Sequence, residues 1–260
     1  PINSASTDDE LVADLRAVRA SVVISFGEKL VGKLELIQQR VAVELRLLLF
    51  EAHCRDPDAA TRSRSGFPAA FSLRCYFNGR AGSPLTTQSP SPRPSPRWLV
   101  RKDTAVLLQT SGTTGQKKLV PQLVEDVIAG ALCIAASVPL GEEDVNVSQM
   151  PLHHVGGILR SVLAPILSGG AVAHLGGFSP KPFWEAACQV GATWYYASPT
   201  MHRLYLDELL ANPPQPEARL RLRYVANAAG GLPAALASEM REGYSRMVGT
   251  CVTIAPSYGM

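Results

Sequence analysis

The chain has 260 residues, of which 46% are hydrophobic and 18% are charged, a composition typical of a globular protein with a sizeable core. Its formal net charge of +3 is too small to indicate nucleic-acid binding, and no basic stripe carries interleaved aromatic residues. No apolar run is long enough to span a membrane, and the length allows one large domain or two smaller ones.

Residues 1–51 have the pattern of part of a first α/β subdomain. Thr7 and Glu10 have the spacing of a capping box, which predicts a helix that runs to about Ala20. Short apolar runs that alternate with helices indicate a largely parallel sheet. The expected elements that follow are a strand over 21–26, a helix over about 28–39 and a strand over 41–50.

Residues 52–97 have a different character, because arginine, glycine and serine are mixed here. The run SPSPRPSPR at 89–97 places proline at every second position, which favours extended, polyproline-like chain. One interpretation is a ligand of an SH3-type domain. We favour a solvated connector between two domains, and predict irregular structure over 52–97.

Residues 98–260 are predicted to form a second α/β subdomain that binds a nucleotide. An apolar run over 105–108 leads into a glycine-rich loop, and helices then alternate with short strands. The expected helices cover 123–137, 158–167, 182–190, 201–210 and a segment from about 233. The expected strands cover 145–150, 171–175, 193–197, 222–227 and 252–255.

The glycine-rich loop lies in the sequence LLQTSGTTGQKKLV at 107–120. Its N–H groups, hydroxyls and the ammonium groups of Lys117 and Lys118 suit a polyphosphate, because glycine leaves the backbone accessible. A flexible surface loop with solvated lysines is the alternative, and the many hydroxyl residues favour the phosphate site. A P-loop kinase or ATPase is excluded, since its fingerprint requires Gly-Lys-Ser/Thr where this chain has Gly115-Gln116-Lys117-Lys118-Leu119.

Small-residue loops follow several of the predicted strands: TSGTTG, HHVGG, ASPT, NAAGG and PSYG. In an open parallel sheet, ligands bind outside the carboxyl ends of the strands, so we expect these loops to form one crevice. The aromatic run Trp194-Tyr195-Tyr196 is expected to belong to the core. His153 and His154 are not expected to bind a metal, because adjacent residues on extended chain point to opposite faces and no third ligand is nearby.

The motifs TSGTTGQKK, PLHHVGG, ASPTMHRL, LRYVANAAGGLP and SYGM occur in this order along the chain. In this order they resemble the large N-terminal, AMP-binding domain of the adenylate-forming acyl-CoA synthetases, the AMP-dependent synthetase-ligase superfamily. The resemblance covers nearly the whole chain outside 52–97, and the stretch 183–210 is most similar to plant and fungal oxalate–CoA ligases. It implies an α/β fold with αβα layers and mostly parallel sheets, truncated at both ends.

The resemblance also implies an activity. The family activates a carboxylic acid with ATP and Mg²⁺ to an acyl-adenylate and pyrophosphate, and a thiol, usually of coenzyme A, then displaces AMP. Both reacting partners are anions, so charge neutralisation and in-line placement are most of the catalysis. The parent protein is therefore expected to be an acid–thiol ligase for a small-molecule carboxylate, such as a fatty acid or oxalate, with ATP, Mg²⁺ and coenzyme A; a carrier-protein pantetheine is the alternative thiol.

The resemblance assigns roles to particular residues. His154 and Lys118 match catalytic positions, and His154 would stand near the carboxylate and acyl entrance; the alternative for His154 is a packed loop histidine. The residues that match the β- and γ-phosphate loop are Thr110, Ser111, Gly112, Thr113, Thr114, Gly115 and Lys118. Those that match the adenine and acyl-pocket segments are Asn227, Ala228, Ala229, Gly230, Tyr258, Gly259 and Met260, with Tyr258 packing on adenine.

Some features depart from the family pattern. Lys117 and Leu119 stand where the family usually has proline and glycine. The chain begins at Pro1 and stops at Met260, so both ends look cut; the family's Thr-Glu pair with its magnesium ligand, its ribose-binding aspartate and its C-terminal lid with a catalytic lysine are not in the sequence. We therefore expect these residues alone to bind nucleotide weakly without complete turnover. A degenerate protein that keeps the fold without the chemistry is the alternative.

The five cysteines (Cys54, Cys75, Cys133, Cys188 and Cys251) are scattered and odd in number. They are expected to be reduced and mostly packed, which indicates a reducing compartment. We expect an intracellular protein of the cytoplasm or the peroxisome.

Overall fold

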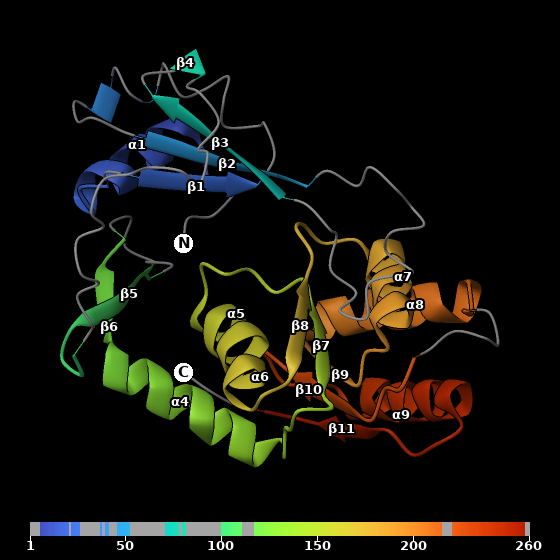
Figure 1. Ribbon diagram of the computed structural model, residues 1–260. Coiled ribbons are helices and arrows are strands. Elements are labelled where there is room, and N and C mark those ends of the chain that lie inside the picture. Colours follow the sequence, from blue (N-terminus) through green and yellow to red (C-terminus); the bar gives the residue numbers. More distant parts are fainter. Residues whose placement is uncertain are drawn as a thin grey trace. The chain divides into compact units, whose positions relative to one another are not determined.

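The computed structural model describes residues 6–20, 22–26, 37, 40–41, 46–52, 71–77, 80–81, 100–110, 117–214 and 220–257. The chain divides into two compact units, residues 2–97 and residues 98–260 (Figure 1).

The N-terminal unit begins with helix α1 (Asp8–Ala17), and the predicted capping box is present at its start. The Glu10 N–H donates to the Thr7 hydroxyl at 3.3 Å, and the Thr7 N–H donates to the Glu10 carboxylate at 2.9 Å. These two bonds satisfy N–H groups that have no partner inside the helix. Leu15 on the inner face of α1 is fully buried beside Ile37.

A four-stranded sheet in the order β1-β2-β3-β4 completes the description of this unit. Strand β1 (Val22–Phe26) runs parallel to β2 (Arg46–Ala52), as expected. Strand β3 (Phe71–Phe77) is antiparallel to β2, and β4 (Arg80–Ala81) is antiparallel to β3, so the sheet is mixed.

Two expectations for this unit were wrong. The second strand begins at Arg46, not at Val41, which is helical. Irregular structure over 52–97 is contradicted by β3 and β4. The aromatic and apolar residues of FSLRCYF favour a strand. This strand was not predicted because the segment around it is rich in arginine and glycine, which are typical of irregular structure. The proline-alternating segment 89–97 and most of the helix expected over 28–39 lie outside the described residues.

The second unit opens with a two-stranded antiparallel ribbon. Strand β5 (Thr104–Gln109) pairs with β6 (Leu119–Leu123), and helix α4 (Val124–Ser137) follows directly. The helix matches its prediction to within one residue. The apolar run before the glycine-rich loop is therefore a strand, but it belongs to this ribbon and is separate from the parallel sheet.

The centre of the unit is a five-stranded, fully parallel sheet in the order β11-β10-β9-β7-β8. Its strands are β7 (Val145–Ser148), β8 (Ala171–His174), β9 (Trp194–Ala197), β10 (Tyr224–Asn227) and β11 (Thr253–Ala255). Each lies within a segment predicted to be a strand. A sheet covered on both faces requires apolar strands, which explains why these short runs could be recognised.

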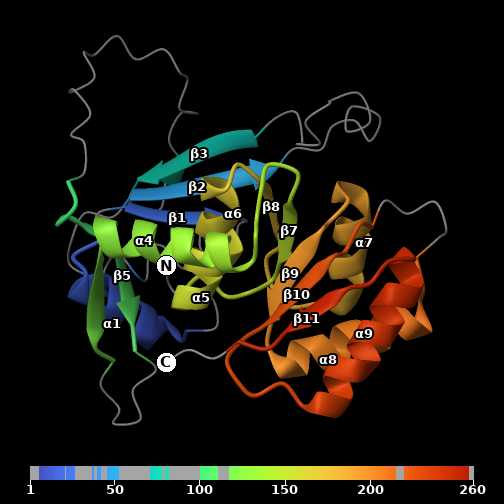
Figure 2. The ribbon, with the colours of Figure 1, turned by 90° about the horizontal axis from the view of Figure 1, so that it is seen from below.

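Helices cover both faces of the parallel sheet, as Figure 2 shows, which confirms the αβα layers. On one face lie α7 (Pro180–Val190), α8 (Pro199–Ala211) and α9 (Ala234–Val248). On the other lies one continuous helical segment made of α5 (Val155–Ile158), the π-helical turn η2 (Leu159–Leu163) and α6 (Ala164–Leu167), against which α4 packs.

The main core lies between the sheet and α7, α8 and α9. Phe183 stacks on Tyr205 with ring centroids 3.9 Å apart, and Tyr195 meets Phe183 edge-on at 5.2 Å. Trp184 donates its indole N–H to the Tyr205 carbonyl at 2.8 Å, so its polar atom is satisfied inside the core. Among the described residues, no helix combines the length and the apolar character needed to cross a membrane.

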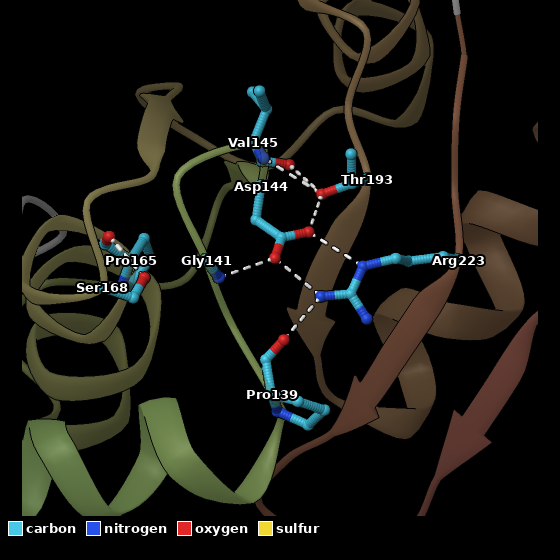
Figure 3. A network of polar contacts seen from close by, with 8 residues as sticks. All are labelled: Pro139, Gly141, Asp144, Val145, Pro165, Ser168, Thr193 and Arg223. Atoms are coloured by element: carbon cyan, nitrogen blue, oxygen red, sulfur yellow. Dashed lines mark hydrogen bonds and ion pairs between the residues drawn. The ribbon is translucent and has the colours of Figure 1, made fainter.

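An ion pair ties together the amino ends of three strands (Figure 3). Asp144 accepts from Arg223 through both carboxylate oxygens, at 2.9 and 2.6 Å, and from the Thr193 hydroxyl at 2.7 Å. Burial raises the pKa of Asp144, but the hydrogen bonds from Arg223, Thr193 and the Gly141 N–H outweigh it, so the pKa lies below its usual value. This network lies at the amino edge of the sheet, opposite the small-residue loops that follow the strands.

The cysteine side chains that the structure describes are not uniformly packed. Cys133 and Cys251 are exposed and Cys188 is half-buried, all as free thiols. The expectation of mostly packed thiols was therefore wrong for two of these three. Helix α4 turns Cys133 away from its buried residues, and Cys251 lies in the turn before β11.

Candidate functional site

Four of the five small-residue loops leave the parallel sheet at the same edge. HHVGG follows β7, ASPT follows β9, NAAGG follows β10 and PSYG follows β11, and these strands are parallel. The Ser257 hydroxyl donates to the Asn227 carbonyl, which joins the loops after β11 and β10. A Cβ added at Gly230 would lie 3.8 Å from Pro199, so the loop after β9 is close as well. The structure therefore brings these loops together, whereas Thr110, the first residue of TSGTTG, lies at the end of the β5–β6 ribbon.

The glycine-rich loop is framed by Thr110 and Lys118. The Thr110 N–H donates to the Lys118 carbonyl at 3.0 Å, and the Lys118 N–H donates to the Thr110 hydroxyl at 3.2 Å. Both residues are exposed. The residues between them that the sequence assigned to phosphate binding, Ser111, Gly112, Thr113, Thr114 and Gly115, lie outside the described residues.

The NAAGG loop is a compact turn at the end of β10. The Asn227 side-chain amide donates to the Gly230 carbonyl at 2.5 Å, and the Gly230 N–H donates to the Ala228 carbonyl at 2.7 Å. Ala229 has φ +56°, a left-handed conformation that costs a non-glycine residue about 1 kcal/mol. Strain of this kind persists where the surrounding structure fixes it, often at a functional site.

Asn227 also offers a hydrogen-bond acceptor. Its residue is 1% exposed, and within the described part of the chain Oδ1 has no hydrogen-bond partner. Such an oxygen fits an N–H donor, and the exocyclic amine of adenine is one. Tyr258, Gly259 and Met260, the other adenine-side residues expected from the sequence, lie outside the described residues.

His154 stands at the N-terminus of α5 and is exposed, so it is not a packed loop histidine. Its ring lies 4.4 Å from that of His153 between centroids. Burial, followed by the proximity of His154 and Lys117, lowers the pKa of His153 below its usual value. Gly157 fixes the path of this loop, because an added Cβ would lie 2.1 Å from the Pro151 carbonyl oxygen.

One residue beside these loops, Arg160, was missed in the sequence, and another, Tyr196, was assigned to the core. Arg160, in the η2 turn, donates to the Ser257 hydroxyl at 3.0 Å, and its guanidinium lies 4.7 Å from the centre of the Tyr196 ring. Trp194 and Tyr195 are fully buried, as expected, but Tyr196 is only half-buried and meets Arg160, so its assignment to the core was wrong. In the sequence, Arg160 could have been noticed as a single charged residue within the apolar run ILRSVLAPIL.

A comparison with models of protein families shows which family the chain belongs to. The profile described as "AMP-binding enzyme" matches residues 1–260. The chain belongs to the AMP-binding enzyme family. The order of the five motifs, which suggested this family, is thus supported over the whole sequence.

Relatives within the AMP-binding family include several CoA ligases. An oxalate–CoA ligase of Arabidopsis thaliana is 33% identical over 148 residues, covering 56% of this chain and 28% of the relative. A sulfoacetate–CoA ligase of Cupriavidus necator is 29% identical over 185 residues, covering 70% of this chain and 35% of the relative. The chain thus spans well under two thirds of the length of these AMP-binding enzymes.

Solved structures of the family share the fold. A malonyl-CoA ligase, in a ternary product complex with methylmalonyl-CoA and AMP, matches with a TM-score of 0.58 and 24% identity. The match covers 99% of this chain and 46% of that ligase. The α/β architecture of both units is therefore that of an AMP-binding enzyme.

Proposed function

We propose that the protein is an ATP-dependent acid–thiol ligase that joins a small carboxylic acid to coenzyme A. The observation that carries this proposal is the meeting of four of the family's motif loops at the carboxyl edge of the parallel sheet. The CoA ligases among the relatives support the reaction class. ATP supplies the nucleotidyl group that turns a carboxylate oxygen into a good leaving group.

The ribbon residues bind the polyphosphate in this proposal. Lys118 brings an exposed ammonium group to the mouth of the glycine-rich loop, and Thr110 adds a hydroxyl. The N–H groups of Ser111, Gly112, Thr113, Thr114 and Gly115 complete the cradle. Fixed cations and N–H donors neutralise the charge that keeps two anions apart, which is the main contribution a protein makes to such a reaction.

The loops after β10 and β11 hold the base. Ala228, Ala229 and Gly230 present small side chains that leave room for a flat ring, while the Asn227 oxygen accepts an N–H. Tyr258, with Gly259 and Met260, packs on adenine through its ring face. His154, exposed at the start of α5, orients the reacting carboxylate at the acyl entrance.

Mg²⁺, coenzyme A and a C-terminal lid remain predictions from the family resemblance. Among the described residues, no group of three or more His, Cys, Asp or Glu side chains could hold a metal ion. The cytoplasm or peroxisome as compartment also stays a prediction.

The test separates an enzyme from a degenerate relative that keeps only the fold. ATP binding to the 260-residue chain is measured by calorimetry, and acid-dependent ATP–pyrophosphate exchange is measured in the full gene product. The acids are oxalate, malonate, sulfoacetate, a medium-chain and a long-chain fatty acid, and a coumarate-like aromatic acid. We expect nucleotide binding and exchange with at least one acid. Absence of ATP binding in the 260-residue chain, together with absence of exchange in the full gene product, would favour the degenerate protein.

A further inference from the structure

Arg160 is a half-buried cation beside the loops at the carboxyl edge of the sheet, and it has no carboxylate partner within the described residues. Two other arginines of the unit are paired with carboxylates. Arg203 contacts Asp207 and Glu239, and Arg223 contacts Asp144. Removing a cation from water is costly unless an anion or several acceptors compensate. Arg160 is therefore placed where a ligand can supply the negative charge.

Neither of the groups that hold Arg160 can neutralise it. Ser257 offers a neutral hydroxyl at 3.0 Å, and Tyr196 offers the face of its ring at 4.7 Å. Burial raises the pKa of Tyr196, an effect that Arg160 opposes only in part, so the phenol is neutral at physiological pH. The two contacts orient the guanidinium and leave its charge available.

The guanidinium has donors left for an anion. It carries five N–H groups in a planar fork, and within the described residues Nη1 makes its one side-chain hydrogen bond, to Ser257. A carboxylate or sulfonate can accept two of the remaining N–H groups side by side. A lysine at the same position would offer a point charge without this geometry.

Arg160 and the loop that carries His154 meet the same side chain, Tyr196. The Arg160 guanidinium lies 4.7 Å from the centre of the Tyr196 ring, and an added Cβ at Gly156, two residues after His154, would lie 2.9 Å from the Tyr196 hydroxyl. One tyrosine side chain thus connects the two positions, so a ligand that contacts both His154 and Arg160 is expected to be short.

We propose that Arg160 is a specificity-determining residue that binds the second anionic group of a short acid. The substrate class is then short dicarboxylates and their sulfonate analogues. This inference rests on the proposed ligase function. Oxalate, sulfoacetate and malonyl groups, the acyl groups named for the related proteins, each carry a second anionic group close to the first, which supports the assignment.

The test compares acids of matched length in the full gene product. Malonate is compared with propanoate and oxalate with acetate, by acid-dependent pyrophosphate exchange in the wild type, Arg160→Ala and Arg160→Lys. We expect Arg160→Ala to lower kcat/KM for the diacids by about 10- to 100-fold while the monoacids change little, because one charge-assisted contact is lost. Arg160→Lys should restore part of the diacid rate. Arg241→Ala, which removes an exposed arginine of α9, is the matched control and should leave both classes unchanged.

Direct binding keeps the proposal testable without turnover. Calorimetric titration of malonate into the 260-residue chain should give a signal that Arg160→Ala weakens by a similar factor. If no acid supports exchange but this signal behaves as stated, the ligase proposal fails and the anion site stands. If Arg160→Ala lowered kcat/KM equally for monoacids and diacids, Arg160 would have a structural role and the proposal would be overturned. A raised KM for ATP with unchanged acid KM would place a phosphate at Arg160 and also overturn it.

Discussion

Thr110 and Lys118 face each other across the mouth of the glycine-rich loop. Each donates a backbone N–H to the other residue, one to a carbonyl at 3.0 Å and one to a hydroxyl at 3.2 Å. The pair extends the β5–β6 register by one step, from the Gln109–Leu119 pair to the residues that border the loop. Ribbon pairing therefore fixes where Lys118 stands, whatever path the intervening residues take.

Lys118→Ala is expected to weaken ATP binding by about tenfold, because a charge-assisted contact to phosphate is lost while the ribbon remains paired. Calorimetric titration with ATP measures this in the 260-residue chain. Lys102→Ala, which removes an exposed lysine in the turn before β5, is the control and should bind as the wild type. Wild-type affinity in Lys118→Ala, with weakened binding in Lys117→Ala, would show that the neighbouring lysine faces the phosphates instead.

Gly157→Ala should be strongly destabilising and should displace the HHVGG loop. The new Cβ would lie 2.1 Å from the Pro151 carbonyl oxygen, which is backbone and cannot rotate away. Overpacking of this kind costs about 1–3 kcal/mol. Gly176→Ala is the matched control, since an added Cβ there meets no atom within 4 Å. Urea unfolding measures both variants, and equal midpoints would contradict the geometry.

Much of the second unit could be predicted from its sequence. Strands buried on both faces are short apolar runs, and glycine or proline marks their ends, so the order of elements follows from local pattern. Helix α4 was expected from Leu123 and begins at Val124. Strand β10 was expected over 222–227 and covers Tyr224–Asn227. Both differences are confined to the ends of the elements. Terminal residues make only some of the hydrogen bonds of a helix or strand, while the apolar pattern of the sequence continues through them, so the pattern does not define the exact end.

The partners of these elements could not be predicted, because local periodicity carries no information on pairing. Strand β5 looked like a member of the parallel sheet, yet its partner is β6, which lies ten residues further along the chain. The contact of Arg160 with Ser257 joins residues 97 apart in the sequence. Tyr195 and Tyr196 are adjacent in one strand and so point to opposite faces of the sheet, but the run of three aromatic residues did not show which of them is buried in the core and which meets Arg160.

Asp144→Asn should destabilise the second unit by about 2 kcal/mol. The Asp144 side chain is 8% exposed and the Arg223 side chain is 40% exposed. The free energy lost with this ion pair is therefore expected to lie between the values for a surface pair and for a buried pair. Its folded-state pKa is lowered, so its stabilising contribution is complete above the unfolded value near 4 and is lost as the pH falls through the folded value.

Urea unfolding between pH 7 and pH 3 measures this contribution. The wild type should lose stability below about pH 4 more steeply than Asp144→Asn does. Glu143→Gln, which neutralises an exposed carboxylate in the same turn, should keep the wild-type pH profile. Parallel profiles for the wild type and Asp144→Asn would contradict a lowered pKa in the ion pair.

His202 should make the stability of the second unit depend on pH. It is fully buried in α8, its Nδ1 lies 3.2 Å from the Tyr195 hydroxyl, and that hydroxyl lies 2.8 Å from the Tyr244 hydroxyl. Burial lowers the pKa of His202 from 6.5 to about 4. Between these values the unfolded chain binds a proton that the folded chain does not, so stability is complete above pH 6.5 and falls as the pH drops to 4.

This lowering of the His202 pKa corresponds to a change of about 3 kcal/mol in the free energy of unfolding, at 1.36 kcal/mol for each pKa unit. Urea unfolding of the wild type should therefore show a free energy of unfolding lower by about that amount at pH 4 than at pH 7. His202→Gln cannot titrate and should flatten this part of the profile. Tyr244→Phe removes the hydroxyl next to Tyr195 but keeps the histidine, so it should lower stability at every pH and leave the slope unchanged. A slope that survives in His202→Gln would mean that another group takes up the proton.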